Sequence, residues 1–384
     1  MVDIILTSSI QQDDYTKAAC EMFDVPPSDS VQTIIKDNLS VPKDDWNVGL
    51  IVGASGSGKT TLLKKFGSPY EHAWDSRPVI SNLSSVDPKK ATEILCAVGL
   101  SSVPSWLRPY SCLSTGEQFR ADLAYALSRV HGDIICLDEF TSVVDRNVAR
   151  AASFALQKYL RRDNRRAVIA SCHKDIIEWL LPDWIYDPTE AMTRVFPRGS
   201  LRRPKIELEV FRSQYEAWNL FKHHHYLTSD LNVSARCFMA MWNRVPVAFL
   251  ATLTQPSGTI KERAFRASRT VVLPDYQGLG IGVRLSDYMG SLIRAREGRF
   301  FSRTVHPAMI AYRISSKSWK ETSHSREIHP PLDHKVKSNW TNLNWVSNLR
   351  YCYSFEYIGK SSSISESDVF WDGLIKDIPM TLLD

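Results

Sequence analysis

The segment GASGSGKT at residues 53–60 constrains this 384-residue chain more than any other stretch, because it matches the pattern GxxxxGK[ST]. A β-rich run, NVGLIV, precedes it, and GKTTLLKKF follows as the start of a helix. In this setting the glycines let backbone N–H groups face phosphate oxygens, and the N-terminus of the helix adds positive potential. The segment therefore predicts a phosphate-binding loop between a strand and a helix.

The residues of this loop have separate expected roles. Lys59 is expected to bridge the β- and γ-phosphates of ATP, and the hydroxyl of Thr60 is expected to hold Mg²⁺. The alternative is a glycine-rich turn without a ligand. The predicted ATP-binding residues of the loop are Gly53, Ser55, Gly56, Gly58, Lys59, Thr60 and Thr61.

A second segment, IICLDEF at residues 134–140, places two carboxylates after a run of apolar residues. Asp138 is expected at the carboxyl end of a strand, where it would hold Mg²⁺, directly or through water. Glu139 is the candidate general base for the attacking water. In isolation this pattern is often only a strand end, but downstream of a phosphate-binding loop it predicts a nucleotide-hydrolysing site.

Five motifs follow one another along the chain: GASGSGKT, LSTGEQ, IICLDE, SVVD and, after the next predicted strand, His173. This ordered set resembles the ATP-binding cassette (ABC) ATPases over about residues 30–190. The resemblance implies an ABC-type ATPase that uses ATP and Mg²⁺ and works as an ATP-dependent head-to-tail homodimer. Taken alone, LSTGEQ is also an ordinary helix cap, because serine and threonine often precede helices.

The resemblance also implies roles for single residues. Ser114 and Gly116 are expected to contact the γ-phosphate bound to the opposite protomer, and Glu117 is a further implied ATP-binding residue. Asp145 matches the D-loop residue that contacts the partner, and His173 matches the histidine that touches the γ-phosphate. The implied catalytic residues of the ATPase are Glu139 and His173, and the implied Mg²⁺ ligands are Thr60 and Asp138.

The sequence departs from the ABC pattern in two places. Residues 61–113 contain no glutamine to ligate Mg²⁺ and sense a coupled domain, and Asn82 is the nearest substitute. The segment is also short for a transporter-type helical subdomain, which favours the soluble ABC ATPases. An aromatic residue that stacks on adenine is expected upstream of the loop, and three candidates stay open: Tyr15, Phe23 and Trp46.

Composition predicts a cytoplasmic protein without a membrane partner. The longest apolar runs are far below the roughly 20 residues that span a bilayer, and the start MVDIILTSSIQQDD lacks the basic residues of a secretory signal. The seven cysteines form no CxxC pair, which indicates reduced thiols. Cys136 and Cys172 lie inside apolar runs and are expected in the core.

The pattern of predicted elements divides the chain. Over 1–195, short apolar strands alternate with helical patterns at 118–130, 146–162 and 174–181, which predicts an α/β P-loop NTPase domain with a mostly parallel sheet. The basic stretch FPRGSLRRPK (196–205) is expected to be a linker. Longer, alternating strands over 206–384 predict an α+β domain, in which SSSISESD (361–368) is expected to be a loop.

A second glycine-rich loop lies in the segment RASRTVVLPDYQGLGIGVRLSDYMGSL, between a predicted strand and helix. A dinucleotide-binding GxGxxG fails, because Val283 occupies the third glycine position. The pattern QxxGxG fits instead and resembles motif A of the GNAT acyltransferases, whose loop amides bind the pyrophosphate of acetyl-coenzyme A. The alternative is a glycine-rich connection. The implied acyl-CoA-binding residues are Gln277, Gly278, Gly280, Ile281 and Gly282.

Candidate catalytic residues for the second domain are Tyr312 and His225. Tyr312 lies on the predicted helix that follows this domain's next strand, where GNAT enzymes often carry a tyrosine that protonates the leaving thiolate. His225, in HHHY at 223–226, is a candidate base toward an acceptor amine. No cysteine or carboxylate lies at metal-ligand spacing from these histidines, so no zinc site is predicted.

The second half, with its HHHY stretch and the predicted strand SRTVHP, resembles the phage Mom proteins, which are GNAT-like enzymes that modify adenine in DNA. Residues 201–384 carry 25 Lys+Arg against 17 Asp+Glu, a balance of +8, whereas residues 1–200 have a balance of −3. This charge favours DNA or RNA as partner, with a DNA base as acceptor. Two alternatives stay open: transfer to a protein, tRNA or small molecule, and a non-catalytic nucleic-acid clamp or defence switch.

Overall fold

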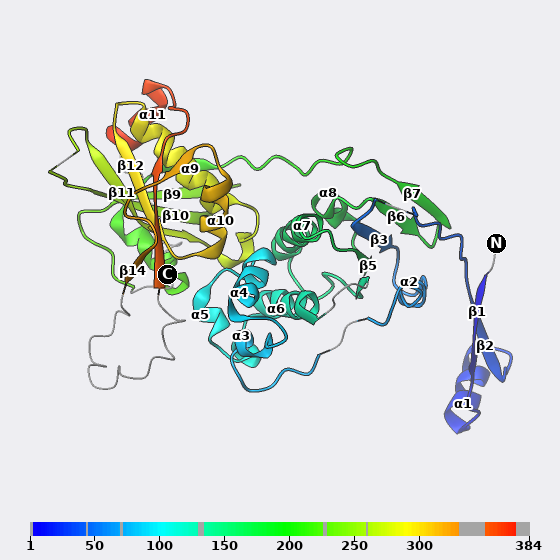
Figure 1. The fold of residues 1–384 in the computed structure, drawn as a ribbon. Coiled ribbons are helices and arrows are strands. Elements are labelled where there is room, and N and C mark those ends of the chain that lie inside the picture. Colours follow the sequence, from blue (N-terminus) through cyan, green and yellow to red (C-terminus); the bar gives the residue numbers. More distant parts are fainter. Residues whose placement is uncertain are drawn as a thin grey trace. The chain divides into compact units, whose positions relative to one another are not determined.

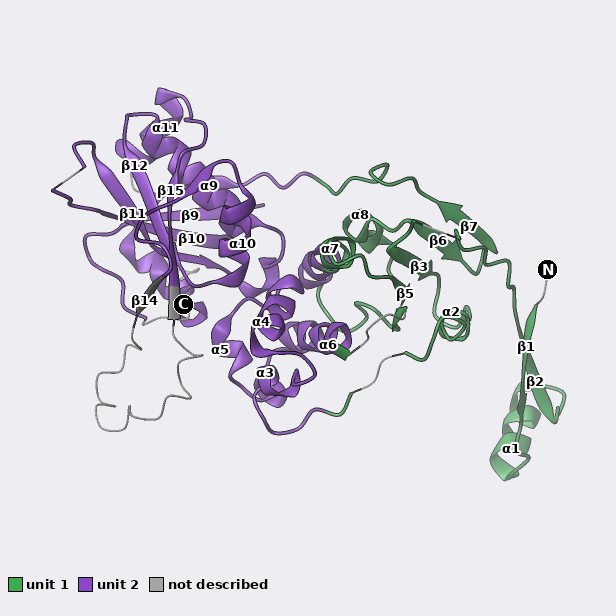
Figure 2. Cartoon of the chain, viewed as in Figure 1, with its two compact units in different colours: residues 1–73, 129–145, 156–204 green, residues 74–128, 146–155, 205–384 purple. Residues whose placement is uncertain are grey.

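The computed structural model describes residues 3–43, 45–69, 72–129, 134–225, 229–258, 260–329 and 350–373. The chain forms two compact units, and each unit combines stretches that are distant in sequence (Figure 2). Unit 1 comprises residues 1–73, 129–145 and 156–204, and unit 2 comprises residues 74–128, 146–155 and 205–384. Lys205, the last residue of the predicted linker, is therefore also the first residue of the last stretch of unit 2.

A five-stranded sheet of order β4-β5-β3-β6-β7 forms the centre of unit 1 (Figure 1). The first four strands are parallel and β7 is antiparallel. Every residue of β3 and β5 is buried, as expected for parallel strands covered on both faces. The α/β sheet predicted for the first half is confirmed. Its strands are β3 (Val48–Val52), β4 (Ile135–Leu137), β5 (Ala167–Ser171), β6 (Trp184–Asp187) and β7 (Met192–Val195).

Helices connect these strands, and a smaller sheet precedes them. The predicted helix at 146–162 has the bounds of α7, and the predicted helix at 174–181 begins as a 3-10 turn. The N-terminal segment forms an antiparallel pair of strands, and one helix lies between the two strands in the sequence. These elements are β1 (Ile4–Ser9), α1 (Asp14–Phe23), β2 (Ser30–Ile35), α2 (Lys59–Leu63), α7 (Arg146–Arg162), η2 (Lys174–Ile176) and α8 (Ile177–Leu180).

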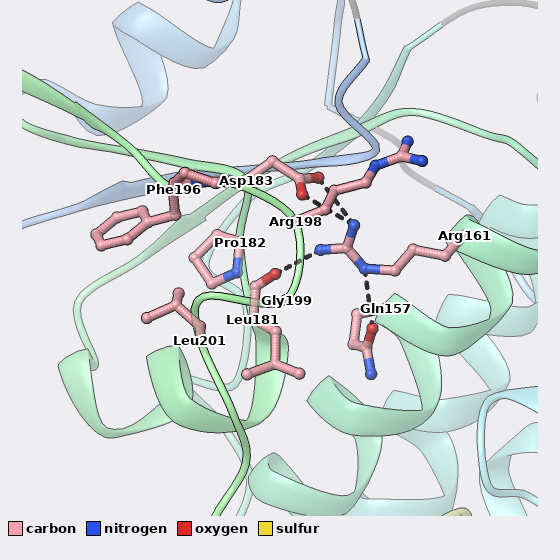
Figure 3. Close-up of a pocket in the computed structure, with 10 residues that line it drawn as sticks. Gln157, Arg161, Leu181, Pro182, Asp183, Phe196, Arg198, Gly199 and Leu201 are labelled. Carbon is pink, nitrogen blue, oxygen red and sulfur yellow. Dashed lines mark hydrogen bonds and ion pairs between the residues drawn. The ribbon is translucent and has the colours of Figure 1, made fainter.

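A buried carboxylate joins the amino ends of two strands of the unit 1 sheet. Asp183 Oδ2 accepts the backbone N–H groups of Asn47 (2.8 Å) and Val48 (2.9 Å), and Asp183 Oδ1 accepts from Arg161 Nη1 (2.9 Å). Arg161 also donates to Leu181 O (2.6 Å), so it closes one side of a pocket of about 270 Å³ (Figure 3). This pocket lies near the amino ends of the strands, away from the phosphate-binding loop, and Arg161 in its lining bonds Gln157 and Asp183 of the same lining.

Replacing Asp183 by asparagine is expected to destabilise the protein. Asp183→Asn removes the charge that pairs with Arg161, and its amide cannot accept all the bonds that the carboxylate accepts. We expect the free energy of unfolding in urea to fall by about 3 kcal/mol. Glu190→Gln, which removes an exposed ion pair with Arg194, is the control and should change it by less than about 0.5 kcal/mol. Equal losses in the two variants would contradict this account.

In the helical segment of unit 2, residues 74–128 and 146–155, Asp122 of α6 (Thr115–Arg129) binds two aromatic side chains. Trp74 Nε1 (2.7 Å) and the Tyr110 hydroxyl (2.9 Å) both donate to this carboxylate, and their rings stack with centroids 4.6 Å apart. The predicted helix at 118–130 is confirmed and begins a few residues earlier. The elements are α3 (Val79–Asn82), α4 (Pro88–Ala97), α5 (Val103–Trp106), η1 (Tyr110–Cys112), α6 (Thr115–Arg129) and the first part of α7.

The C-terminal part of unit 2 is a mostly antiparallel sheet of order β13-β15-β12-β11-β10-β9-β8, with β14 paired to β15. Its one parallel ladder among the described residues joins β11 to β12, over Ala264–Arg266 and Arg299–Phe301. The strands are β8 (Glu209–Ser213), β9 (Arg236–Trp242), β10 (Val245–Thr254), β11 (Ala264–Val272), β12 (Arg299–Thr304), β13 (Trp319–Glu321), β14 (Glu327–His329) and β15 (Arg350–Tyr357).

Helix α9 (Ile281–Arg294) packs against β10, β11 and β12, and α11 (Ile364–Trp371) packs against α9 (Figure 1). The prediction of a loop at 361–368 is wrong, because Ser363 caps a helix whose Phe370 is buried between aromatic rings of the sheet. Cys172 is exposed, against the prediction of a core residue, whereas Cys136 is buried. The remaining elements are η3 (Tyr215–Leu220), η4 (Lys222–His224), η5 (Pro274–Tyr276) and α10 (Pro307–Ser315).

Candidate functional site

The phosphate-binding loop connects the end of β3 to the start of α2. Gly58 caps α2 with a φ of +86°, and a Cβ at this position would lie 2.7 Å from the Ile35 side chain. Gly56 also has a positive φ, +77°, which non-glycine residues rarely adopt. Lys59 is buried, and its Nζ donates to Ala54 O at 2.7 Å, so the ammonium lies over the loop itself. The sequence places glycine where the loop requires it.

The parallel order β4-β5-β3 brings three predicted motifs to one edge of the sheet. Asp138 follows β4, His173 follows β5, and Gly53 follows β3. Gly53 N donates to Ser171 O (3.3 Å), and His173 N donates to Ser171 Oγ (3.1 Å), which connects the two neighbouring loops. Carboxyl ends of parallel strands are where ligands bind in α/β sheets. This edge of unit 1 is therefore the candidate nucleotide site.

The carboxylate segment turns sharply at this edge. Glu139 and Thr141 have φ values of +47° and +70°, which cost about 1–3 kcal/mol each in a non-glycine residue. Ser142 Oγ donates to Glu139 Oε2 (2.7 Å), and Glu139 N donates to Asp138 Oδ1 (2.9 Å). Glu139 is exposed and Asp138 is half-buried. The turn thus leaves the Glu139 side chain exposed to solvent and the Asp138 side chain half-buried at the end of β4.

The LSTGE segment lies in unit 2, where it begins α6. Glu117 Oε2 accepts from Ser114 N (3.1 Å) and Ser114 Oγ (3.2 Å), and Ser114 O accepts from Gln118 N. This is the arrangement of a capping box, so the helix-cap interpretation of the motif holds at the level of local structure. Ser114 is exposed, and a Cβ on Gly116 would lie 3.1 Å from Val148 of α7. Asp145 is the last residue before α7.

Two of the substitutes named for missing ABC features have other partners. Trp46 is buried, with its ring edge-on to Trp184 at 5.6 Å, so it is not available to stack on adenine. Tyr15 and Phe23 lie on α1, 87% and 75% exposed. Asn82 is buried and its amide donates to the carbonyl groups of Arg77 and Pro78, which leaves it as a local cap in α3.

The QxxGxG loop has the expected strand-loop-helix setting, but Gln277 faces a neighbour that the sequence did not predict. Gly280 caps α9 with a φ of +82°, and Ile281 is buried. Gln277 Oε1 accepts from Ser101 N (2.7 Å), and its Nε2 donates to Val272 O (2.9 Å). A Cβ on Gly282 would lie 3.2 Å from the Val272 side chain.

The hydroxyl of Tyr312 already has a partner. It donates to Asp287 of α9, and the other oxygen of this carboxylate accepts from Trp319 Nε1 (2.7 Å). Burial and Asp287 raise the pKa of Tyr312, so the hydroxyl keeps its proton at neutral pH. Its role as a proton donor stays a prediction, and that role would require the bond to Asp287 to be exchanged.

His225 lies in the core of the C-terminal domain, edge-on to Trp218 at 5.8 Å. Burial, with a smaller effect of Arg269, lowers its pKa to about 4, which makes it a weak base. Tyr226 of the same stretch lies outside the described residues. No group of three or more His, Cys, Asp or Glu residues with the geometry of a metal site occurs among the described residues.

The low pKa of His225 predicts how stability depends on pH. The unfolded chain takes up this proton near pH 6.5 and the folded protein only near pH 4, so acidification favours unfolding within this window. We expect His225 to account for up to about 3 kcal/mol of stability lost between pH 7 and pH 4. In urea titrations, His225→Phe should show a shallower pH dependence. His223→Phe, at an exposed site, should keep the parent slope, and equal slopes in all three proteins would contradict the prediction.

No model of a known protein family matches the chain, and no curated protein matches it. Among solved structures it is similar to a Clostridium perfringens cassette that is part of the ABC transporter complex cbiONQ, at 18% identity and a TM-score of 0.32, over 44% of this chain and 80% of that chain. It is also similar to a dimeric bacterial ABC transporter cassette, at 17% identity and a TM-score of 0.31, over 42% of this chain and 85% of that chain. Both resemble its N-terminal part. No helix in the described ranges has the length and apolar character to cross a bilayer.

Proposed function

We propose that the first half of the chain binds and hydrolyses ATP with Mg²⁺ as an ABC-type ATPase. The supporting observation is the shared edge of β4, β5 and β3, where Asp138, His173 and the phosphate-binding loop follow neighbouring strands. Lys59 and the loop amides would hold the phosphates, and Thr60 and Asp138 would hold Mg²⁺. Glu139 would take the proton of the attacking water.

The same proposal makes the active form a dimer of two chains. The exposed Ser114 of the LSTGE segment would contact the γ-phosphate held by the partner's loop, and Asp145 would lie at the contact between the chains. ATP would stabilise this dimer because the nucleotide binds to both chains at once, and hydrolysis would release it.

Replacing Glu139 by glutamine is expected to trap the ATP-bound dimer. Glu139→Gln keeps the size of the side chain but removes the base, so hydrolysis should fall by a factor of about 100 or more, while ATP binding persists. Light scattering after size exclusion with ATP and Mg²⁺ should show a dimer, and Lys59→Ala should stay monomeric under the same conditions. Glu178→Gln, at an exposed position of unit 1, is the matched control. A monomer for Glu139→Gln in saturating ATP would contradict the dimer.

We further propose that the C-terminal domain is a GNAT-like transferase that uses an acyl-CoA. The ladder between β11 and β12 ends at Arg266 and Phe301, although β11 runs on to Val272 and β12 to Thr304. The glycine-rich loop and the N-terminus of α9 follow the carboxyl end of β11, where these strands no longer pair. Backbone amides at such a helix N-terminus favour phosphate groups, which supports the loop as the pyrophosphate-binding element.

The proposed acceptor is a nucleic acid, with a DNA base as the first choice. The support is the basic balance of the second half, and exposed cations lie on or beside the two parallel strands of the sheet. They are Lys261, Arg263, Arg266 and Arg303. A surface of this charge would bind the phosphates of the nucleic-acid backbone without distinguishing between base sequences.

Mass spectrometry of nucleosides from cells that produce the protein tests the transferase proposal. We expect a new acylated or otherwise modified nucleoside in DNA, absent from cells that produce Lys59→Ala. A modified nucleoside in tRNA alone, or acetyl-CoA turnover that does not depend on DNA, would move the acceptor to the other substrate classes. Failure of acetyl-CoA to bind in calorimetry would contradict a transferase and favour a non-catalytic clamp.

A further inference from the structure

The loop at Gln277 contacts the helical segment that carries the LSTGE motif, and all residues of this contact belong to unit 2. Gly99 and Gly278 have φ values of +86° and +89°, and their two turns face each other. A Cβ on Gly99 would lie 2.9 Å from Gln277 O, and a Cβ on Gly278 would lie 2.9 Å from the Cβ of Ala155 in α7. The backbones of the two turns are therefore in contact, and a side chain at Gly99 or Gly278 would not fit between them.

A chain of short hydrogen bonds runs from the LSTGE segment to this contact. Glu117, which caps α6, accepts from Ser105 Oγ at 2.6 Å through its second oxygen. Ser105 precedes Trp106 in α5, and Trp106 Nε1 donates to Leu100 O at 2.7 Å. Ser105 and Trp106 are both buried. Ser101, which follows Leu100 in the chain, donates its backbone N–H to Gln277 Oε1.

A second connection runs through packing alone. Gly116 of the LSTGE segment lies against Val148 of α7, and one to two turns further along the same helix Ala151 and Ala155 lie against Gly278. Helices of this length transmit displacement as rigid bodies, because closely packed interiors do not deform continuously. On the opposite side of the contact, His306 Nε2 lies 3.3 Å from Ser101 O, which ties the start of α10 to the same turn.

We propose that Gln277 is a positioning residue that couples the nucleotide-dependent state of the LSTGE segment to the loop 277–280 and the start of α9. This inference rests on the proposed ATPase function. ATP bound to a partner chain would fix Ser114 and Glu117, and the bonds of Ser105, Trp106 and Ser101 would carry the change to Gln277. Because Gln277 also holds the end of β11 through Val272, the loop that follows this strand would move with it.

Coupling of this kind acts in both directions, so a ligand at the loop would change the affinity for ATP by the same factor. The role of Gln277 is distinct from binding a ligand, because both polar atoms of its side chain are occupied by backbone partners.

Hydrogen exchange of the whole chain in the Glu139→Gln background tests the coupling. We expect ATP with Mg²⁺ to change deuterium uptake in two places, residues 113–120 and residues 273–290. With Gln277→Met added, the change at 113–120 should persist, whereas the change at 273–290 should fall to roughly half or less. Gln157→Met is the matched control, because Gln157 is buried and bonded to Arg161 within unit 1.

A milder variant keeps the test decisive if Gln277→Met does not fold. Ser105→Ala removes one hydroxyl and should weaken the response at 273–290 in the same direction. Ser153→Ala, at a buried serine that bonds only within α7, should not. The coupling alone would be overturned if Gln277→Met or Ser105→Ala kept the full response at 273–290. It would also be overturned if ATP changed deuterium uptake at 113–120 but not at 273–290 in the Glu139→Gln background. Absence of ATP binding, measured by calorimetry on the same samples, would overturn the ATPase proposal together with it.

Discussion

Strand β5 pairs with β4 on one side and with β3 on the other, and this pairing determines which loops lie together at the carboxyl ends of the strands in unit 1. The three strands come from distant parts of the sequence, and each continues directly into a polar loop. Parallel pairing places these loops side by side, which no local property of the sequence requires. Hydrogen bonds of Ser171 to both neighbours then fix the loops against each other.

In the C-terminal domain, α9 has a comparable central position. Its Asp287 accepts from Tyr312 and Trp319, so one carboxylate joins α9 to α10 and to β13. Near its other end, Leu292 O accepts from Trp371 Nε1 of α11. These bonds connect the helix that follows the glycine-rich loop to α10, α11 and β13, and α9 itself packs on β10, β11 and β12.

Much of the candidate nucleotide site could be predicted from the sequence because its motifs combine local chemistry with fixed order. GASGSGKT and LDEF each specify a loop after a strand, and the structure has β3 and β4 at those places. The partners of Gln277 and Tyr312 could not be predicted in this way. Ser101 is 176 residues from Gln277, and Asp287 is 25 residues from Tyr312, so neither contact leaves a periodic signal. The helix at Ile364–Trp371 was missed because serine-rich stretches resemble loops until a buried aromatic pair follows.

The two glycine turns at Gly99 and Gly278 limit the replacement of one part of this chain, before or after residues 196–205, by a different sequence. Unit 2 is assembled from residues on both sides of the predicted linker at 196–205, and these turns meet inside it. A chain cut at the linker would separate the two surfaces of one compact unit and leave Ala151, Ala155 and the Gly99 turn without their cover. A different helical segment placed against the loop at Gln277 would need a matching glycine turn and small residues on its helix. The two parts of the chain therefore depend on each other for a contact in which Ala151 and Ala155 are buried.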